Sequence, residues 1–360
     1  MTADNRTFSR REFAKTNLAV LAGVGSGSLL TGQSRGSEQK PKIIVESARK
    51  IFSSAGEKRQ YNSFTNMAVW KGRYYVVFRQ ALHHGVSESG IMLLQSDDLK
   101  KWTVKEVINT EHDDRDPKLL ATADRLFVYS DAFMPGAVDQ MMLTFTDDGR
   151  TWSEPQKIYK PSWQLWKPKQ HKGAYYVAAD CFTCGRKSEL LKSTDGIDWE
   201  PIGLITDKNV PTETAITFLP DDRILAVIRQ NIDGHPPGFA IAEPPYTDWT
   251  LSGGKGHFSG PAIDMVGDTV VVASRTLLED WNLPPEPGLE HQRTALYTFN
   301  LESMSLELQA VLPTDTGGDS SYPGIQPIGD DRALVCWHDG STTWHHPSPS
   351  NIWLAEIRVE

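Results

Sequence analysis

Short apolar runs separated by polar turns repeat along the chain at intervals of about fifty residues. Six times, an apolar run meets a short polar turn and a second apolar run follows. A further strand pair comes after most of these hairpins, starting for example at 91–95 and at 140–145. The turns lie near 71–72, 123–124, 172–173, 221–222, 267–268 and 330–331. Four strands per repeat, six repeats and almost no helical periodicity predict an all-β fold, a six-bladed β-propeller.

Each end of the chain carries a strand that lacks a repeat of its own. Residues 42–46 form an apolar run before the first full repeat, and the last repeat ends at 352–359, one strand short. We expect the N-terminal strand to join the last blade, because circular closure removes exposed strand edges. Two stacked sandwiches could use as many strands, but they would not predict a fixed period.

Four tryptophans repeat with nearly the same period: Trp102, Trp152, Trp199 and Trp249. Segments 146–152 and 193–199, which end at two of them, match the Asp-box pattern S/T-x-D-x-G-x-T-W with slight departures. In such a turn the aspartate accepts backbone N–H bonds, glycine supplies a positive φ and tryptophan packs beneath. We interpret these segments as fold markers and not as catalytic sites.

A polar residue stands seven positions after each turn, at the end of an apolar run. Equivalent positions of a propeller lie on one face, so these residues predict a common solvent-filled face, which we call the rim. Three guanidiniums on one rim would form a fork for a carboxylate or another planar anion. The six residues are Arg79, Asp131, Asp180, Arg229, Arg275 and His338.

The first strand of each hairpin starts beside the end of the second, so its first residues should share the rim. At that place the sequence has Ser63, Asp116, Gln164, Glu213, Ser259 and Tyr322. Asp116, Glu213 and Tyr322 carry acid–base or nucleophilic chemistry, but each also has a structural alternative. Asp116 precedes Pro117 and could form a turn, Glu213 could simply pair with Arg229, and Tyr322 could be a packed aromatic.

Two further pairs on the same repeats remain open. His83 and His84 follow the first rim arginine and could contact substrate or serve the structure alone. Trp163 and Trp166 could form a platform for a sugar or pack in the core.

Composition limits the partners. The chain has 360 residues and a net charge of -9, which makes nucleic acid an unsuitable partner. No apolar stretch in the body of the chain is long enough to cross a membrane. We expect one catalytic domain over 38–360, acting as a monomer.

The N-terminus has a different character. The segment 9–15, Ser-Arg-Arg-Glu-Phe-Ala-Lys, precedes the moderately apolar run 18–30. A twin arginine before such a run is typical of a Tat export signal, here spanning 1–37 with its linker. The mature protein would then be periplasmic or secreted. The alternative is a basic amphipathic start to a cytoplasmic protein.

Three cysteines are present, and Cys181 and Cys184 have the C-x-x-C spacing of zinc and redox sites. A zinc site would need a second pair of ligands at matching spacing, and the sequence offers none. We therefore expect a loop disulfide or two buried thiols, with no metal and no cofactor.

Taken together, these features resemble the exo-sialidases over roughly 62–360. The likeness is greatest to bacterial sialidase-like proteins with an R-D-P-K-L segment, here 115–119, and an S-Y-P-G segment, here 321–324. The resemblance implies that Arg79, Arg229 and Arg275 bind a substrate carboxylate and that Asp116 is the general acid/base. It further implies that Tyr322 is the nucleophile, Glu213 its partner, and Asp339 the acid that orients the first arginine, although His338 fits that spacing as well. We also expect His84 to contact the substrate.

The implied chemistry is retaining hydrolysis of a terminal acidic sugar. A sialic-acid-like sugar carries a carboxylate on its anomeric carbon, which would repel a carboxylate nucleophile but not a neutral phenol. The Arg-Ile-Pro segment usual near the first arginine is absent, because Gln80 follows Arg79. Another acidic nonulosonic or uronic sugar would suit the same fork. Two other classes remain open: a propeller that binds acidic glycans without cleaving them, and a lyase or uronidase that uses tyrosine and histidine.

Overall fold

The computed structural model describes residues 40–85, 87–134, 137–181, 183–284, 291–316, 318–340 and 349–360. The expected export signal at 1–37 lies outside the described residues. No helix in these ranges has the length and apolar character needed to span a membrane. Among the residues that the structure describes, one short 3-10 helix, η1 (Leu278–Trp281), accompanies the strands.

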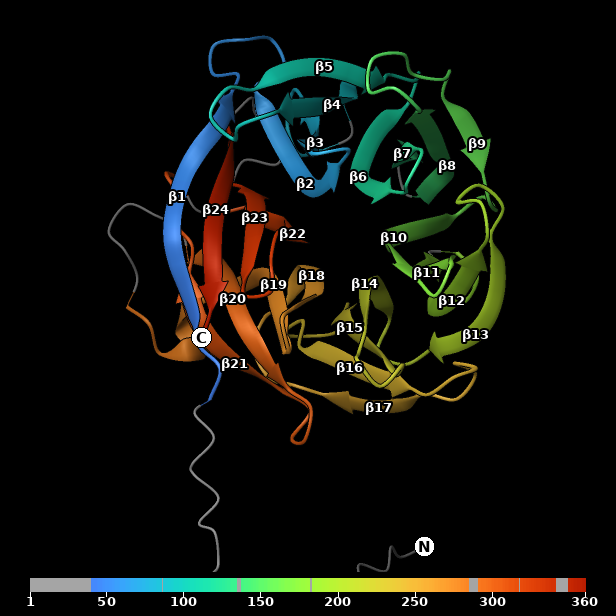
Figure 1. Cartoon of the computed structure of the whole chain (residues 1–360), viewed down its shortest axis with the longest axis vertical. Helices are drawn as coiled ribbons and strands as arrows, with labels where there is room; N and C mark the ends of the chain where they lie inside the picture. The colour runs from blue at the N-terminus through green and yellow to red at the C-terminus, as the bar shows by residue number, and fades with distance from the viewer. Residues whose placement is uncertain are drawn as a thin grey trace, which may run out of the picture. The chain divides into compact units, whose positions relative to one another are not determined.

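Six four-stranded antiparallel sheets stand around a central axis as the blades of a propeller (Figure 1). Blade 1 contains β2 (Tyr61–Trp70), β3 (Arg73–Ala81), β4 (Ser89–Ser96) and β5 (Thr103–Ile108). Blade 2 contains β6 (Asp113–Ala121), β7 (Leu126–Met134), β8 (Ala137–Thr146) and β9 (Gln156–Ile158). Blade 3 contains β10 (Trp163–His171), β11 (Ala174–Cys181), β12 (Lys187–Ser193) and β13 (Glu200–Thr206).

The second half of the ring repeats this plan. Blade 4 contains β14 (Pro211–Phe218), β15 (Ile224–Gln230), β16 (Pro237–Ala242) and β17 (Thr250–Gly253). Blade 5 contains β18 (Ser259–Val266), β19 (Thr269–Leu277), β20 (Gln292–Asn300) and β21 (Ser305–Val311). Blade 6 contains β22 (Ser321–Pro327), β23 (Arg332–His338), β24 (Asn351–Val359) and β1 (Ile43–Ser53).

The N-terminal strand closes the ring, as the sequence predicts. β1 pairs antiparallel with β24 from Ile43 opposite Val359 to Ser53 opposite Asn351. In Figure 1 the blue β1 runs beside the red β24. The early strand thus supplies the edge that the last repeat lacks, and the prediction of a closed six-bladed propeller is confirmed.

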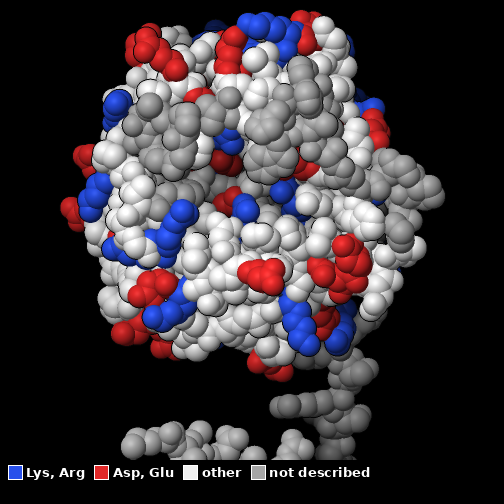
Figure 2. Space-filling model, turned by 180° about the vertical axis from the view of Figure 1, so that it is seen from behind, with Lys and Arg blue, Asp and Glu red and all other residues white. Residues whose placement is uncertain are grey.

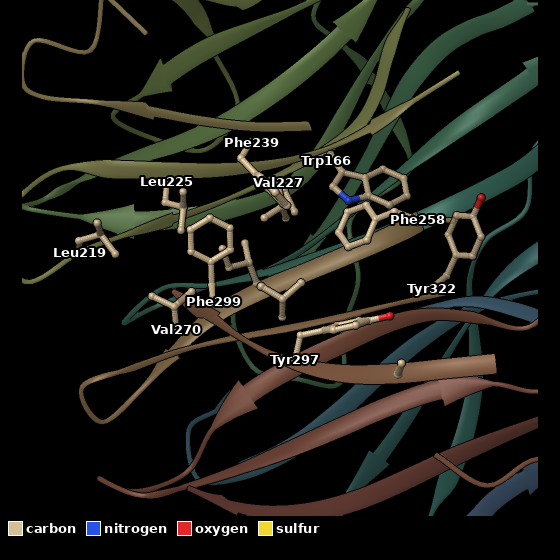
Figure 3. Packing of buried hydrophobic residues seen from close by; sticks show 14 of the residues in the cluster. Trp166, Leu219, Leu225, Val227, Phe239, Phe258, Val270, Tyr297, Phe299 and Tyr322 are labelled. Carbon is tan, nitrogen blue, oxygen red and sulfur yellow. The ribbon is translucent and has the colours of Figure 1, made fainter. Parts of the chain in front are cut away.

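Hydrophobic side chains are buried on both faces of each blade. In β19, Val270 and Val272 pack toward one neighbouring blade, while Val271 and Ala273 belong to a different buried cluster. This alternation follows from the two-residue period of a strand and explains why the middle strands read as continuous apolar runs. Figure 3 shows the cluster around Phe239 and Tyr297, with Tyr322 at one end of it.

The turns that end at the repeated tryptophans share one hydrogen-bond arrangement. Asp148 Oδ1 accepts the N–H groups of Arg150 and Thr151 at 2.8 Å, and Asp195 Oδ1 accepts those of Ile197 and Asp198 at 2.8 and 2.9 Å. These aspartates stabilise the turns between outer strands.

The innermost strand of every blade contains a β-bulge next to the rim. In each case the strand register shifts and a residue at the shift adopts a positive φ between 42° and 59°; in β22 the preceding residue, Ser321, also has a positive φ, of 91°. Such a backbone costs a non-glycine residue about 1–2 kcal/mol, and bulges re-aim the side chain that they carry. The six residues are Phe64, Asp116, Lys167, Glu213, Gly260 and Tyr322. Three of them are the proposed catalytic residues.

Candidate active site

Tyr322 and Glu213 face each other across the ring from the bulges of blades 6 and 4. The Tyr322 hydroxyl donates a hydrogen bond to Glu213 Oε1 at 2.7 Å. Arg229 Nη1 donates to the same carboxylate oxygen at 2.5 Å and to the tyrosine hydroxyl at 3.1 Å. The three groups therefore form one hydrogen-bonded unit in which a tyrosine proton has an acceptor ready.

Electrostatics fix the resting protonation of this unit. Burial, reinforced by the negative charge of Glu213, raises the pKa of Tyr322 well above its usual value. Burial alone would raise the pKa of Glu213, but Arg229 and the hydrogen bonds from Tyr322 and Gly260 outweigh it and lower that pKa. The resting pair is a neutral phenol and a carboxylate.

Gly260 makes room for the tyrosine. Its backbone N–H donates to Glu213 Oε2 at 2.7 Å, which satisfies the second carboxylate oxygen. Its φ is +59°, and a Cβ there would lie 2.7 Å from Cγ of Tyr322. A glycine is needed because both the backbone conformation and the close approach of the ring exclude a side chain.

Arg275 lies beside the tyrosine ring. Its guanidinium carbon is 5.1 Å from the centre of the Tyr322 ring, and it donates to the Ser320 carbonyl at 2.7 Å and to Asp319 at 2.5 Å. Asp319 also accepts hydrogen bonds from Tyr61 and His84. Although burial opposes it, Arg275 and His84 hold the pKa of Asp319 below its ordinary value, so this buried carboxylate stays charged.

Asp116 occupies the bulge of blade 2 with its Oδ1 buried and without a hydrogen-bond partner among the described residues. The Lys118 ammonium, which lies 3.8 Å from the centre of the Trp166 ring, donates to the Asp116 carbonyl and is 4.0 Å from Oδ1. Burial and the charge of Glu213 raise the pKa of Asp116, with Lys118 opposing. A carboxyl group that keeps its proton to higher pH suits a general acid.

Arg79 differs from the other two rim arginines because its side chain is fully buried and its donors are used. Nε and Nη2 bind Asp113 Oδ1 at 2.9 and 2.7 Å, and Nη1 donates to the His83 carbonyl at 3.0 Å. The side chain is 0% exposed, against 22% for Arg229 and 11% for Arg275. The geometry leaves Arg229 and Arg275, but not Arg79, available to a ligand.

The remaining expected residues are also placed. His84 lies in the site through its contact with Asp319. Asp339 does not contact Arg79: it accepts hydrogen bonds from Asn351 and from the Trp353 indole, the latter at 2.9 Å. The acid that orients Arg79 is Asp113. Trp163 and Trp166 are buried in core clusters, and Cys181 and Cys184 form a disulfide.

Four site residues were missed by sequence reasoning. They are Asp113 and Arg115 at the start of β6, Asp319 just before the S-Y-P-G segment, and His257. Burial and the neighbouring Arg275 lower the pKa of His257 to about 4, so its imidazole is neutral beside the fork. Asp113 and Arg115 lie within three residues of Asp116 in the sequence, and this proximity could have indicated that they belong to the site. His257 has no equivalent in the other repeats.

Viewed from behind, the molecule is hollowed at the centre of the face, and acidic and basic side chains lie together in the hollow (Figure 2). No group of three or more His, Cys, Asp or Glu side chains in the described ranges is arranged to hold a metal ion. The arrangement offers a phenol with a proton acceptor, a carboxyl group whose pKa is raised, and two partly exposed guanidiniums.

The comparisons with known proteins identify the fold. No protein-family model matches the sequence, and no curated protein matches it. A protein of unknown function from Dyadobacter fermentans has a TM-score of 0.71 at 16% identity, with 89% of this chain and 100% of that chain covered. The phage phi92 endosialidase has a TM-score of 0.66 at 9% identity, with 87% and 69% covered.

The Trypanosoma rangeli sialidase has a TM-score of 0.60 at 10% identity, with 89% of this chain and 59% of that chain covered. For the same sialidase a covalent intermediate with 2,3-difluorosialic acid has been described. This chain thus spans little more than half of that enzyme. At such identities the comparisons establish a propeller fold like that of sialidases.

Proposed function

We propose that this protein is a retaining exo-glycosidase that removes a terminal sugar bearing a carboxylate on its anomeric carbon, of the sialic acid type. The observation that carries the proposal is the Tyr322 hydroxyl, which donates to Glu213 at 2.7 Å while Arg229 binds both. A buried tyrosine coupled to a buried carboxylate is an activated nucleophile without charge at the reacting atom. The sialidase-like fold supports the same assignment.

The reaction uses each residue at a stated atom. The Tyr322 oxygen attacks the anomeric carbon and its proton passes to Glu213, while Asp116 gives its proton to the leaving oxygen as the glycosidic bond breaks. Asp116 then takes a proton from water, the water oxygen displaces the tyrosine, and Glu213 returns the proton. Two displacements give retention of configuration. Arg229 and Arg275 bind the sugar carboxylate and hold the anomeric carbon in place.

The test is turnover of a panel of aryl glycosides of sialic, other nonulosonic and uronic acids, with product stereochemistry followed by NMR. Tyr322→Phe should lose at least about 10³-fold in kcat, as expected for loss of a nucleophile. Tyr129→Phe is the matched control, because the Tyr129 hydroxyl donates to the Gly196 carbonyl between blades 2 and 3 and not to Glu213. Incubation with 2,3-difluorosialic acid should add one sugar mass to Tyr322.

Contrary outcomes identify the alternatives. Full activity in Tyr322→Phe would refute the nucleophile. Binding of acidic glycans with no turnover would support a glycan-binding propeller, and an unsaturated product would support a lyase. We further propose export through the Tat pathway by residues 1–37, tested by replacing Arg10 and Arg11 with lysine and locating the protein in cell fractions.

A further inference from the structure

Arg115 lies next to the proposed acid, at the start of β6, and has an open side. Its Nε donates to Asp113 Oδ2 at 2.7 Å and its Nη2 to the His84 carbonyl at 2.8 Å. Its guanidinium carbon is 4.9 Å from the centre of the Phe133 ring. The described residues provide no hydrogen-bond partner for Nη1, and the side chain is 11% exposed.

This guanidinium is held more firmly than an ordinary surface arginine. Asp113 is 2% exposed and binds Arg79 through Oδ1 and Arg115 through Oδ2. Arg79 is wholly buried and donates to Asp113 and to the carbonyls of His83 and Gly85, so its charge supports the carboxylate that fixes Arg115 while its guanidinium is out of reach of a ligand. A long side chain fixed in one rotamer, with one donor edge free, is pre-organised to bind an oxygen group.

The position of Arg115 relative to the fork indicates which part of a substrate it meets. Arg115 donates to the carbonyl of His84, and the ring of His84 contacts Asp319. Asp319 in turn accepts a hydrogen bond from Arg275, so His84 and Asp319 lie between the two arginines. Arg115 is therefore no part of the Arg229–Arg275 pair. It directly precedes Asp116, which in the proposed reaction faces the leaving oxygen.

We propose that Arg115 is a substrate-contacting residue that binds a carboxylate or sulfate on the leaving-group side of the scissile bond, with Arg79 as the buried residue that positions it through Asp113. This rests on the proposed function, because Asp116 defines the leaving-group side. The substrate class is then a glycan with an acidic group on both sides of the bond that is cleaved. A simple sialoside with a neutral neighbour would leave the Arg115 site empty.

The test compares two substrates with the same terminal sugar. One has a neutral aryl leaving group and the other a second sugar that carries a carboxylate. The wild type should show a KM about 10- to 100-fold lower for the acidic disaccharide, the range expected for a charge-assisted hydrogen bond. Arg115→Met should remove this preference, so that the KM for the acidic disaccharide rises toward that for the neutral glycoside, while Arg115→Lys should keep part of it.

Arg125→Met is the matched control, because Arg125 pairs with Asp147 on the surface. Equilibrium binding of the acidic disaccharide to Tyr322→Phe, with and without Arg115→Met, gives a readout that does not need turnover. The same loss of affinity there would uphold the Arg115 site even if the glycosidase proposal failed. Equal effects on both substrates, or no preference in the wild type, would overturn the inference.

Discussion

Blades 1 to 3 and blades 4 to 6 use the residue at the end of the second strand in different ways, except that His338 of blade 6 resembles blades 1 to 3: it is buried, and its Nδ1 accepts the Phe64 N–H of blade 1 at 3.2 Å. In blades 4 to 6, Glu213, Arg229 and Tyr322 bind one another, and the side chain of Arg229 is 22% exposed. In blades 1 to 3, Arg79, Asp131 and Asp180 are at most 1% exposed. There the residue at the end of each second strand binds the innermost strand of the next blade. We call these contacts interblade clasps.

The interblade clasps show that the residue at the end of a second strand can have a purely structural role. Asp131 accepts a hydrogen bond from Gln164, and Asp180 accepts two from Thr214, at 3.0 Å from its N–H and 2.9 Å from its hydroxyl. Thr214 directly follows Glu213, so the Asp180 clasp stabilises the bulge that orients the Glu213 carboxylate. In blades 1 to 3 the ends of the second strands therefore hold the neighbouring strands in place, whereas the side chain of Arg229 in blade 4 stays partly exposed.

The largest effect should separate Arg79 from Arg229. Arg79→Met leaves one side of the buried Asp113 carboxylate without its partner and should lower the free energy of unfolding by about 3–5 kcal/mol. Arg229→Met also removes a partner of a buried carboxylate, but Glu213 keeps hydrogen bonds from Tyr322 and Gly260, so we expect a smaller loss of about 1–3 kcal/mol in stability and a fall in kcat/KM of roughly 10²–10³-fold. Urea unfolding and steady-state kinetics measure the two quantities. If Arg229→Met were the less stable variant, the division of the rim would be wrong.

Gly260→Ala tests the close approach between Gly260 and the Tyr322 ring. The new Cβ meets Cγ of Tyr322 at 2.7 Å, so the ring must move away from Glu213. We expect a loss of about 10²-fold in kcat and about 1–3 kcal/mol in stability. Gly173→Ala is the control: its φ is +78° with nothing within 4 Å of the new Cβ, so it carries only the backbone cost. Equal kcat in the two variants would contradict the steric argument.

Asp180→Asn tests a clasp through its pH dependence. Burial raises the pKa of Asp180 to about 6, above the value of about 3.9 in an unfolded chain. The stabilising contribution of the protonated form is therefore complete below about pH 4 and is lost as pH rises through 6. The uncharged variant should gain on the wild type by about 2 kcal/mol between pH 4 and 7 in urea unfolding. A constant difference across that range would show that Asp180 does not titrate there.

The smallest effect belongs to the outer turns, remote from both halves of the rim. Asp195→Ala removes the acceptor for the N–H groups of Ile197 and Asp198 and should cost about 1 kcal/mol. Asp198→Ala, in the same turn, keeps that acceptor and should cost less. Neither should change kcat/KM by more than about twofold. A larger change in kcat/KM would mean that these turns affect the positions of the rim residues.

The repeat in the sequence predicted the fold because propeller blades have one period and one strand order. It also predicted that Glu213 and Tyr322 share a face, and their side chains meet at 2.7 Å. It did not predict the bulges, whose register shifts place Phe64 and Lys167 where Ser63 and Gln164 were expected. A bulge depends on local backbone geometry, which apolar periodicity does not encode.

The sequence could not predict the burial of Arg79 either. Its partner Asp113 lies in the next blade, and an arginine at a strand end gives the same pattern whether its donors are used or free. Asp339 has the same difficulty, because its partners Asn351 and Trp353 come from the strand after it. Position in a repeat assigns a residue to a face, and only its contacts assign it to a task.

The pairing of β1 with β24 has a consequence for synthesis of the protein. The first strand leaves the ribosome early and must wait for the last strand before the ring can close, and contacts so distant in sequence form slowly. Tyr322 belongs to the blade completed by this pairing. A nascent or shortened chain that lacks β24 would therefore lack the assembled blade that carries the proposed nucleophile, and we expect it to be inactive.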